Sequence, residues 1–213
     1  MFTEGIDLKS IKNLIFDVGD VLIGFRWMDM LTDDFGIPKE RAVHIGPKVF
    51  EDPIWMELDA GRKQVDEVVD YYMAKYPEDG DIIKRMFAEG ERMAVKREGV
   101  WEAVERLKEC GYRIYLLSNY SKYLFEKHTA DMSVIPLLDG KVISYEVKAI
   151  KPEPEIYEHI LNKYDLNASE SIFFDDKEEN VNAAKALGIS AFRITSEEML
   201  LDLLHEIASV RMV

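Results

Sequence analysis

The sequence predicts an α/β fold, a Rossmann-like layered parallel sheet with an inserted all-helical cap. In the second half of the chain, short apolar runs typical of buried strands alternate with segments of helical periodicity. Between residues 25 and 96, helix formers dominate and there is little strand signal. Alternating strands and helices favour parallel strands joined by right-handed crossovers, and continuous apolar strands are typical of sheets covered on both faces.

The first strand is expected at Leu14–Phe16, an apolar run that ends abruptly at Asp17. After the helical region, apolar residues recur with helical spacing over residues 98–110, and Gly111 ends that helix. These two elements mark the beginning of the sheet and the return of the chain to it.

The remaining elements alternate in the same way. Short apolar runs predict strands at residues 113–118, 172–174 and 189–194. Helical patterns predict helices at residues 121–130, 153–164, 178–187 and 196–208. Prolines open the second of these helices and a glycine closes the third, which is common at helix ends.

Residues 25–96 are expected to form a small helical cap inserted after the first strand. An apolar stripe at helical spacing runs through this region, at Val65, Val68, Val69 and Tyr72. Prolines and glycines separate short helices. We therefore divide the chain into a core domain, residues 1–24 and 97–213, and a cap domain, residues 25–96. A helical layer of the same domain is the alternative.

Composition restricts the class of protein. The chain has 213 residues and a formal net charge of −14, so its field would repel a nucleic acid. Its single cysteine, Cys110, cannot form an intrachain disulfide, which favours a reducing compartment. We find no signal peptide and no uncharged run of membrane-spanning length. We expect a cytoplasmic protein, a monomer or weak homodimer, that binds a small molecule and neither nucleic acid nor membrane.

Polar side chains follow three of the expected strands at the point where each strand ends. In strand order they are Asp17, then Ser118 and Asn119, then Asp175 and Asp176. Any of them alone could be a turn residue or a helix cap. Because ligands of parallel sheets bind at the carboxyl ends of strands, their shared position predicts a single site.

Two further features suggest phosphate chemistry at this site. Lys151, fixed by the following Pro152, could neutralise phosphoryl oxygens, although Lys148 competes for the same role. One of the paired aspartates could cap the next helix, and the other, facing Asp17, would form a costly cluster of like charges, which Mg²⁺ would relieve. Asn180, one helical turn beyond the pair, could orient a carboxylate or a metal-bound water.

With these residues in this order, the chain resembles the haloacid dehalogenase-like hydrolase superfamily over nearly its whole length. It looks closest to the small sugar-phosphate phosphatases of that superfamily. Two segments carry this likeness, Asp17 to Leu22 and the cap segment Leu58 to Arg62. The resemblance implies a Mg²⁺-dependent phosphatase of a small phosphomonoester that works through an aspartyl-phosphate, with a sugar phosphate such as a hexose 1-phosphate as the expected substrate.

The resemblance also implies roles for the residues that handle the phosphoryl group. Asp17 would be the nucleophile, and Lys151 would offset its charge and bind substrate. Ser118 and Asn119 would hold the transferring phosphoryl group. Positioning and neutralisation of charge are what phosphoryl transfer requires above all.

The implied metal ligands are Asp17, the backbone carbonyl of Gly19, and Asp176. Asp175 and Asn180 would support these ligands without touching the ion. The bound ion would be Mg²⁺.

Gly19 departs from the pattern of the superfamily. Most of its phosphatases carry a second Asp two residues after the nucleophile, which protonates the leaving group and then activates water. Such a group contributes on the order of 10²–10⁴-fold to the rate. Asp20 is a poor substitute, because in a locally extended segment its side chain would point away from Asp17. Substrates with good leaving groups, such as sugar 1-phosphates, should suffer least.

Three other functions stay open. Dehalogenases and phosphonatases of the superfamily also lack the second Asp. A dehalogenase needs no metal, so the pair Asp175 and Asp176 argues against it. A phosphonatase needs a lysine in the cap, for which Lys48 and Lys63 are candidates. The third alternative is a catalytically weak binding or regulatory protein on the same fold.

Overall fold

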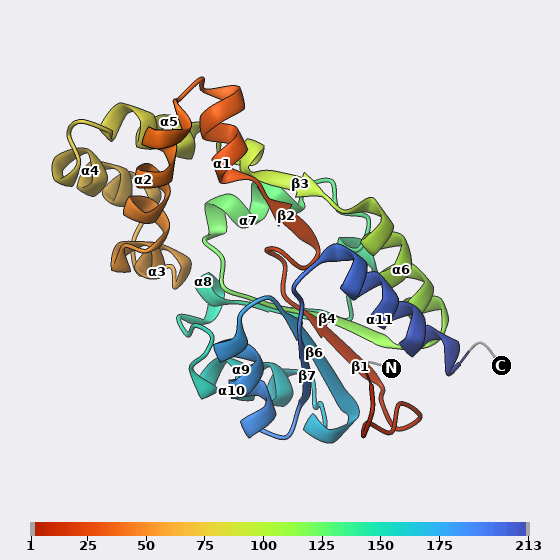
Figure 1. Cartoon of the computed structure of the whole chain (residues 1–213). Helices are drawn as coiled ribbons and strands as arrows, with labels where there is room; N and C mark the ends of the chain where they lie inside the picture. The colour runs from red at the N-terminus through yellow and green to blue at the C-terminus, as the bar shows by residue number, and fades with distance from the viewer. Residues whose placement is uncertain (1–2, 212–213) are drawn as a thin grey trace.

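Five parallel strands form the central sheet in the order β5-β4-β1-β6-β7 (Figure 1). Their bounds are β1 Asn13–Phe16, β4 Arg113–Ser118, β5 Gly140–Ile143, β6 Ser171–Asp175 and β7 Ser190–Arg193. The structure is a computed structural model and describes residues 3–211. The first strand of the chain, β1, lies in the centre of the sheet between β4 and β6. The predicted α/β class is confirmed.

Helices cover both faces of the sheet (Figure 1). On one face lie α6 Glu98–Glu109 and α11 Glu197–Ser209, and on the other α9 Pro154–Lys163 and α10 Glu178–Ala186. Leu14 and Phe16 of β1 belong to the first core, whereas Ile15 belongs to the second. Successive side chains of a strand point to opposite faces, so one apolar run supplies both cores.

The cap lies above the carboxyl edge of the sheet (Figure 1). Its helices are α1 Trp27–Asp29, α2 Lys39–Phe50, α3 Pro53–Asp59, α4 Val65–Lys75 and α5 Gly80–Ala88. The strands β2 Ile23–Phe25 and β3 Ala94–Lys96 pair antiparallel and carry the chain into and out of it. The predicted apolar stripe buries Val68 and Tyr72 of α4.

Shorter elements complete the chain. They are α7 Lys122–Thr129, α8 Ser144–Val147, the π-helical turn η1 Met30–Asp34 and three 3₁₀ turns, η2 Gly90–Met93, η3 Ile135–Leu137 and η4 Ala168–Glu170. Within the described residues, the helices are too short or too polar to cross a membrane.

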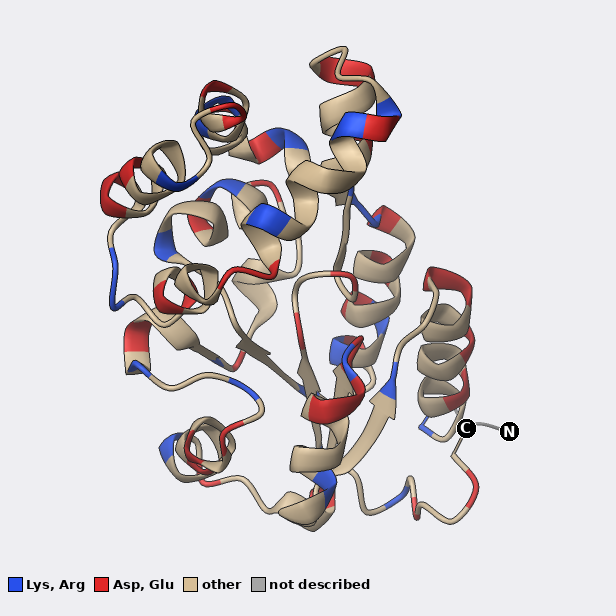
Figure 2. Cartoon of the chain, turned by 60° about the vertical axis from the view of Figure 1, so that its left-hand side comes forward, with Lys and Arg blue, Asp and Glu red and all other residues tan. Residues whose placement is uncertain are grey.

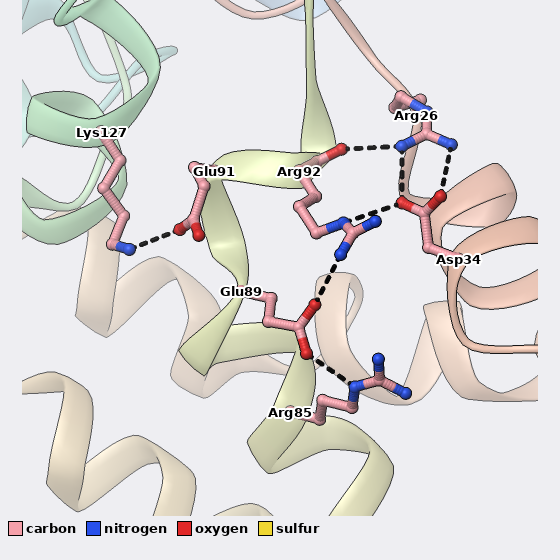
Figure 3. Close-up of polar contacts among 7 residues, drawn as sticks. All are labelled: Arg26, Asp34, Arg85, Glu89, Glu91, Arg92 and Lys127. Atoms are coloured by element: carbon pink, nitrogen blue, oxygen red, sulfur yellow. Dashed lines mark hydrogen bonds and ion pairs between the residues drawn. The ribbon is translucent and has the colours of Figure 1, made fainter.

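Ion pairs join the two linkers between cap and core (Figure 3). Asp34 accepts hydrogen bonds from Arg26, which follows β2, at 2.8 Å and from Arg92, which precedes β3, at 3.2 Å. On the core side, Lys127 of α7 lies 2.5 Å from Glu91. These pairs range from half-buried to exposed, and ion pairs near the surface contribute little stability.

The core elements predicted from the sequence are all present, with ends displaced by no more than one residue. The sequence pattern did not predict β5. This strand lies at the edge of the sheet, and its apolar signal is confined to Val142 and Ile143. A run this short does not differ from an apolar loop segment.

Candidate active site

The carboxyl ends of β1, β4 and β6 bring the predicted site residues together. Phe16, the last residue of β1, lies opposite Leu116 of β4 and Phe174 of β6. Asp17 therefore emerges between Ser118 and Asp175, at the point in the sheet where strand order reverses. Parallel sheets place their ligands in this crevice.

The hydrogen bonds to the Asp17 carboxylate fall on one of its two oxygens. Its Oδ1 accepts hydrogen bonds from Ser118 Oγ at 2.5 Å and from the backbone N–H of Val18 at 2.8 Å. Lys151 Nζ lies 3.0 Å from the same oxygen. Within the described residues Oδ2 accepts no hydrogen bond, which makes it the oxygen available for nucleophilic attack or for a cation. Burial raises the pKa of Asp17 to about 6, against the opposing charge of Lys151.

Asp175 holds Lys151 in place. Its Oδ2 lies 2.5 Å from Lys151 Nζ, and its Oδ1 accepts hydrogen bonds from the backbone of Lys177 at 2.8 Å and from Asn180 at 2.9 Å. Asp175 is fully buried. Its carboxylate is therefore committed to the protein, which agrees with the supporting role expected for Asp175 and Asn180.

Asn119 fixes the backbone of the same lysine. Its Nδ2 donates to the carbonyl oxygen of Lys151, and its Oδ1 accepts from the amide of Lys151, both at 2.8 Å. The side chain of Asn119 thus positions the lysine, and the expected contact of Asn119 with a phosphoryl group stays a prediction. Lys148 plays a different part, because its Nζ donates to Gly61 of the cap at 2.5 Å.

Asp176 completes a cluster suited to a cation. Ligand oxygens of Asp17, Asp175 and Asp176 lie within 4.8 Å of one another. Burial raises the pKa of Asp176 to about 7, and the charges of the other two aspartates add to the effect. With Asp175 committed to Lys151, the oxygens left for an ion belong to Asp17 and Asp176. These hard oxygen donors in a cluster of like charge fit Mg²⁺.

A cavity of about 460 Å³ separates this edge of the sheet from the cap. Its cap side is aromatic and acidic, lined by Phe25, Trp27, Phe50, Trp55, Glu51, Asp52 and Asp59. Among the described lining residues, the cations are Lys151 and Lys177, both from the core. Acidic positions also occur on helices of both cap and core (Figure 2). Anionic groups are therefore favoured only at the floor of the cavity.

The predicted site residues meet at this floor. Asp17, Gly19, Asn119, Lys151 and Asp176 line the cavity. The remaining predicted residue is the serine at the end of β4, which is 1% exposed and reaches the site through its hydrogen bond to the first aspartate.

The structure also shows the surroundings of Gly19, where most phosphatases of the superfamily carry an aspartate. A Cβ added at Gly19 would lie 3.9 Å from Tyr120, at ordinary contact distance, so the position has room for a side chain. The sequence analysis assumed a locally extended segment at Asp20, but this residue adopts φ 54° and is not extended. Its Oδ1 accepts a hydrogen bond from Phe25 at 3.0 Å, which ties it to the cap linker.

The sequence analysis assigned no role to one carboxylate of the cavity, that of Asp59. Asp59 ends α3 and lines the cavity from the cap side. Its carboxylate accepts hydrogen bonds from the backbone N–H of Ser121 and from the side chain of Trp55, and burial raises its pKa to about 7. The signal available in the sequence was its place in the cap segment that resembles the sugar-phosphate phosphatases.

Comparison with known proteins decides the family. The sequence profile of the haloacid dehalogenase-like hydrolases matches residues 11–188. The chain belongs to this family. Among the relatives of this hydrolase is a sesquiterpene phosphatase from Aspergillus oryzae, 27% identical over 87% of the chain and 91% of that protein. A D-ribitol-5-phosphate phosphatase from Bacteroides thetaiotaomicron is 24% identical over 86% of the chain and 91% of that protein.

Solved structures agree with the fold of the hydrolase. A haloacid dehalogenase-like enzyme from Bacteroides thetaiotaomicron, in complex with magnesium and inorganic phosphate, superposes with a TM-score of 0.71. It is 25% identical and covers 88% of this chain and 96% of its own. The superfamily inferred from the strand-end residues is thus confirmed, and with it the expectation that the chain is an enzyme.

Proposed function

We propose that the chain is a Mg²⁺-dependent phosphatase that hydrolyses a small phosphomonoester through an aspartyl-phosphate on Asp17. One observation carries the proposal: Asp17 Oδ1 is bound by Ser118 and Lys151, Oδ2 accepts no hydrogen bond from the described residues, and a carboxylate oxygen of Asp176 lies within 4.8 Å of one of Asp17. A buried carboxylate held in this way has one oxygen oriented for attack. The phosphatases among its relatives support the same reaction class.

In the proposed reaction, Oδ2 of Asp17 attacks phosphorus while the bond to the leaving oxygen breaks. Lys151 offsets the charge of Asp17 and of the phosphoryl oxygens, and Ser118 keeps Oδ1 turned away from the reaction axis. Mg²⁺, held by Asp17, Asp176 and the carbonyl of Gly19, would neutralise charge on the phosphoryl group. Water then attacks the aspartyl-phosphate, releasing phosphate and restoring the carboxylate. Positioning and charge neutralisation supply most of such a rate enhancement.

The cavity beyond the phosphate position supports a leaving group without a second negative charge. Its cap side offers aromatic rings, with Phe50 and Trp55 in edge contact at 4.8 Å between centroids, together with carboxylates. Aromatic surface suits a sugar ring or an apolar body, whereas carboxylates repel an anion. The names of the two relatives give a sesquiterpene and a polyol phosphate.

A hexose 1-phosphate stays our predicted substrate, because its leaving group needs less protonation than a primary alcohol. Turnover of hexose 1-phosphates and 6-phosphates, compared at equal concentration, tests this choice. A strong preference for the 6-phosphate contradicts it.

Phosphate release from p-nitrophenyl phosphate tests the reaction class. We expect release with Mg²⁺, none with EDTA, and loss of activity in Asp17→Asn. If a broad panel of phosphate esters yields no phosphate, a binding or regulatory protein is the better account.

The phosphonatase alternative finds little support, because its candidate lysines are engaged in ion pairs outside the cavity. Lys48 pairs with Asp79 at 2.6 Å and Lys63 with Glu67 at 3.0 Å. A dehalogenase needs no metal, so a dehalogenase function would not explain the position of Asp176 in the carboxylate cluster. We also propose, from the sequence, a cytoplasmic monomer or weak homodimer whose cap spans residues 25–96.

A further inference from the structure

The reaction proposed above needs a proton donor that Gly19 cannot supply. In an in-line displacement the leaving oxygen lies on the side of phosphorus opposite the attacking oxygen. Asp17 attacks from the floor of the cavity, so the leaving oxygen faces the cap. The water that later attacks the aspartyl-phosphate enters at the same position. One acid–base group on the cap side could therefore serve both steps.

Two of the other carboxylates that line the cavity, Asp20 and Asp52, are already committed to partners in the protein. Asp20 is bound to the backbone of Phe25. Asp52 lies 2.6 Å from Lys75 and accepts a hydrogen bond from the backbone of its own helix. The hydroxyl of Tyr120 is also engaged, at 2.8 Å from a ring nitrogen of His128.

Asp59 differs from these groups. Within the described residues its carboxylate makes no ion pair, and its hydrogen bonds come from Ser121 and Trp55. It lines the cavity from the end of α3, on the cap side. The remaining cap carboxylate, Glu51, is exposed at the rim.

The end of α3 is fastened to the core, which fixes where Asp59 points. Ser144 of α8 donates to the carbonyl oxygen of Asp59 at 2.5 Å. Arg62 donates to the carbonyl oxygen of Lys148 at 3.1 Å, and Lys148 Nζ donates back to Gly61 at 2.5 Å. A catalytic group must be held close to its productive geometry, and these three contacts across the domain boundary do so.

We propose that Asp59 supplies from the cap the acid–base group that Gly19 lacks; this inference rests on the proposed role of Asp17 as nucleophile. In the first step the P–O bond to the leaving group breaks, and the leaving oxygen takes the proton of the Asp59 carboxyl. In the second step the Asp59 carboxylate takes a proton from water. The water oxygen then bonds to phosphorus, and the bond between phosphorus and Asp17 breaks.

The surroundings of Asp59 suit both steps. Burial holds its pKa near 7, so acid and base forms are both populated at neutral pH. The charges that face it are Lys177, which favours the ionised form, and Asp17, which opposes it. The donors Ser121 and Trp55 also favour the ionised form.

The test compares two leaving groups in Asp59→Asn. Nitrophenolate can leave without being protonated. The alkoxide of a hexose 6-phosphate must be protonated as it leaves. We expect kcat on the hexose 6-phosphate to fall by about 10² or more, and kcat on p-nitrophenyl phosphate to fall only a few fold. Asn keeps the acceptor oxygen for Ser121 and Trp55. Asp70→Asn, at an exposed carboxylate of α4 outside the cavity lining, is the matched control and should leave both rates unchanged.

A second variant tests the same role independently of the cap. Gly19→Asp places a carboxylate where the superfamily usually has one, in a position with room for it. It should restore hexose 6-phosphate turnover to Asp59→Asn while adding little to the wild type. The fall of the wild-type rate on hexose 6-phosphate above neutral pH should vanish in Asp59→Asn.

The outcomes separate the inference from the function beneath it. An equal loss on both esters in Asp59→Asn, or no loss, overturns the role of Asp59 alone. A large gain from Gly19→Asp in the wild type also overturns it, because a working acid would already be present. A wild-type protein that releases no phosphate from either ester overturns the proposed function, and the inference with it.

Discussion

Lys151 places its ammonium nitrogen 3.0 Å from Oδ1 of Asp17, and both side chains are buried at the floor of the cavity. The same nitrogen lies 2.5 Å from Asp175. One cation thus serves two carboxylates, and Asp176 adds a third. Counted as ions, these four side chains carry a net charge of −2, which one divalent cation would balance. A bound divalent cation would therefore lower the cost of holding these carboxylates together.

Removal of this lysine should be severe for stability. Lys151→Met leaves Asp17 and Asp175 buried without a counter-charge, and a broken buried ion pair costs about 3–5 kcal/mol. We expect a loss of this size in the free energy of unfolding, measured by urea denaturation at pH 7, together with loss of phosphatase activity. Lys148→Met is the control, since Lys148 is exposed and donates to the cap. If Lys151→Met unfolds at the wild-type urea concentration, the buried triad does not stabilise the fold.

The ion pairs between the cap linkers should behave differently in the same assay. Asp34 accepts hydrogen bonds from Arg26 and Arg92 near the surface (Figure 3). Water and salt screen such pairs, and each partner regains hydration when the other is removed. We expect Asp34→Asn to shift the urea midpoint far less than Lys151→Met does. A loss comparable to that of Lys151→Met would show that the linkers determine the stability of the whole chain.

Asp176 gives a prediction for pH and metal. Its pKa in the folded protein is raised from 3.8 to about 7, so between these pH values the folded state binds more protons than the unfolded state. The stability that it contributes is therefore full below about pH 4 and is lost as pH rises through 7. In EDTA, Asp176→Asn should become progressively more stable than the wild type from pH 5 to pH 8.

Magnesium should reverse this order. An ion that binds the folded state raises its stability by mass action, so Mg²⁺ should raise the melting temperature of the wild type and not that of Asp176→Asn. Glu178→Gln is the control, because Glu178 is exposed and pairs with Arg193. Equal stabilisation of wild type and Asp176→Asn by Mg²⁺ would place the ion elsewhere.

The floor of the site was predictable from the sequence because its signals are local. Each of Asp17, Ser118 and Asp175 directly follows an apolar run, and the rules for parallel sheets bring such strand ends together. Strand order followed from no local signal. The shared chemistry of the strand ends predicted only that they form one site.

The partners of individual side chains in the site were not predictable, because these partners are distant in the sequence. Asp59 owes its environment to Ser121 and Trp55, and the first of these lies in the core. Asn119 has the residue type expected for phosphate binding, yet its amide bonds to Lys151, 32 residues away. A sequence pattern identifies the polar side chain, but it does not identify the residue to which that side chain forms a hydrogen bond.

The cap wall yields a prediction about substrate charge. Met56 is 50% exposed and lines the cavity on the cap side, where the charged lining residues are acidic. Met56→Arg adds a cation there. Two unit charges about 4 Å apart in water interact by about 1 kcal/mol, or about fivefold in a rate ratio. We expect the ratio of kcat/KM for 2-phosphoglycolate to that for a hexose phosphate, whose leaving group is uncharged, to rise by about this factor. The gain should shrink at high salt.

Val43→Arg, 39% exposed on α2 and outside the cavity lining, is the control and should leave the ratio unchanged. A folded Met56→Arg with an unchanged ratio would show that the leaving group does not approach this wall.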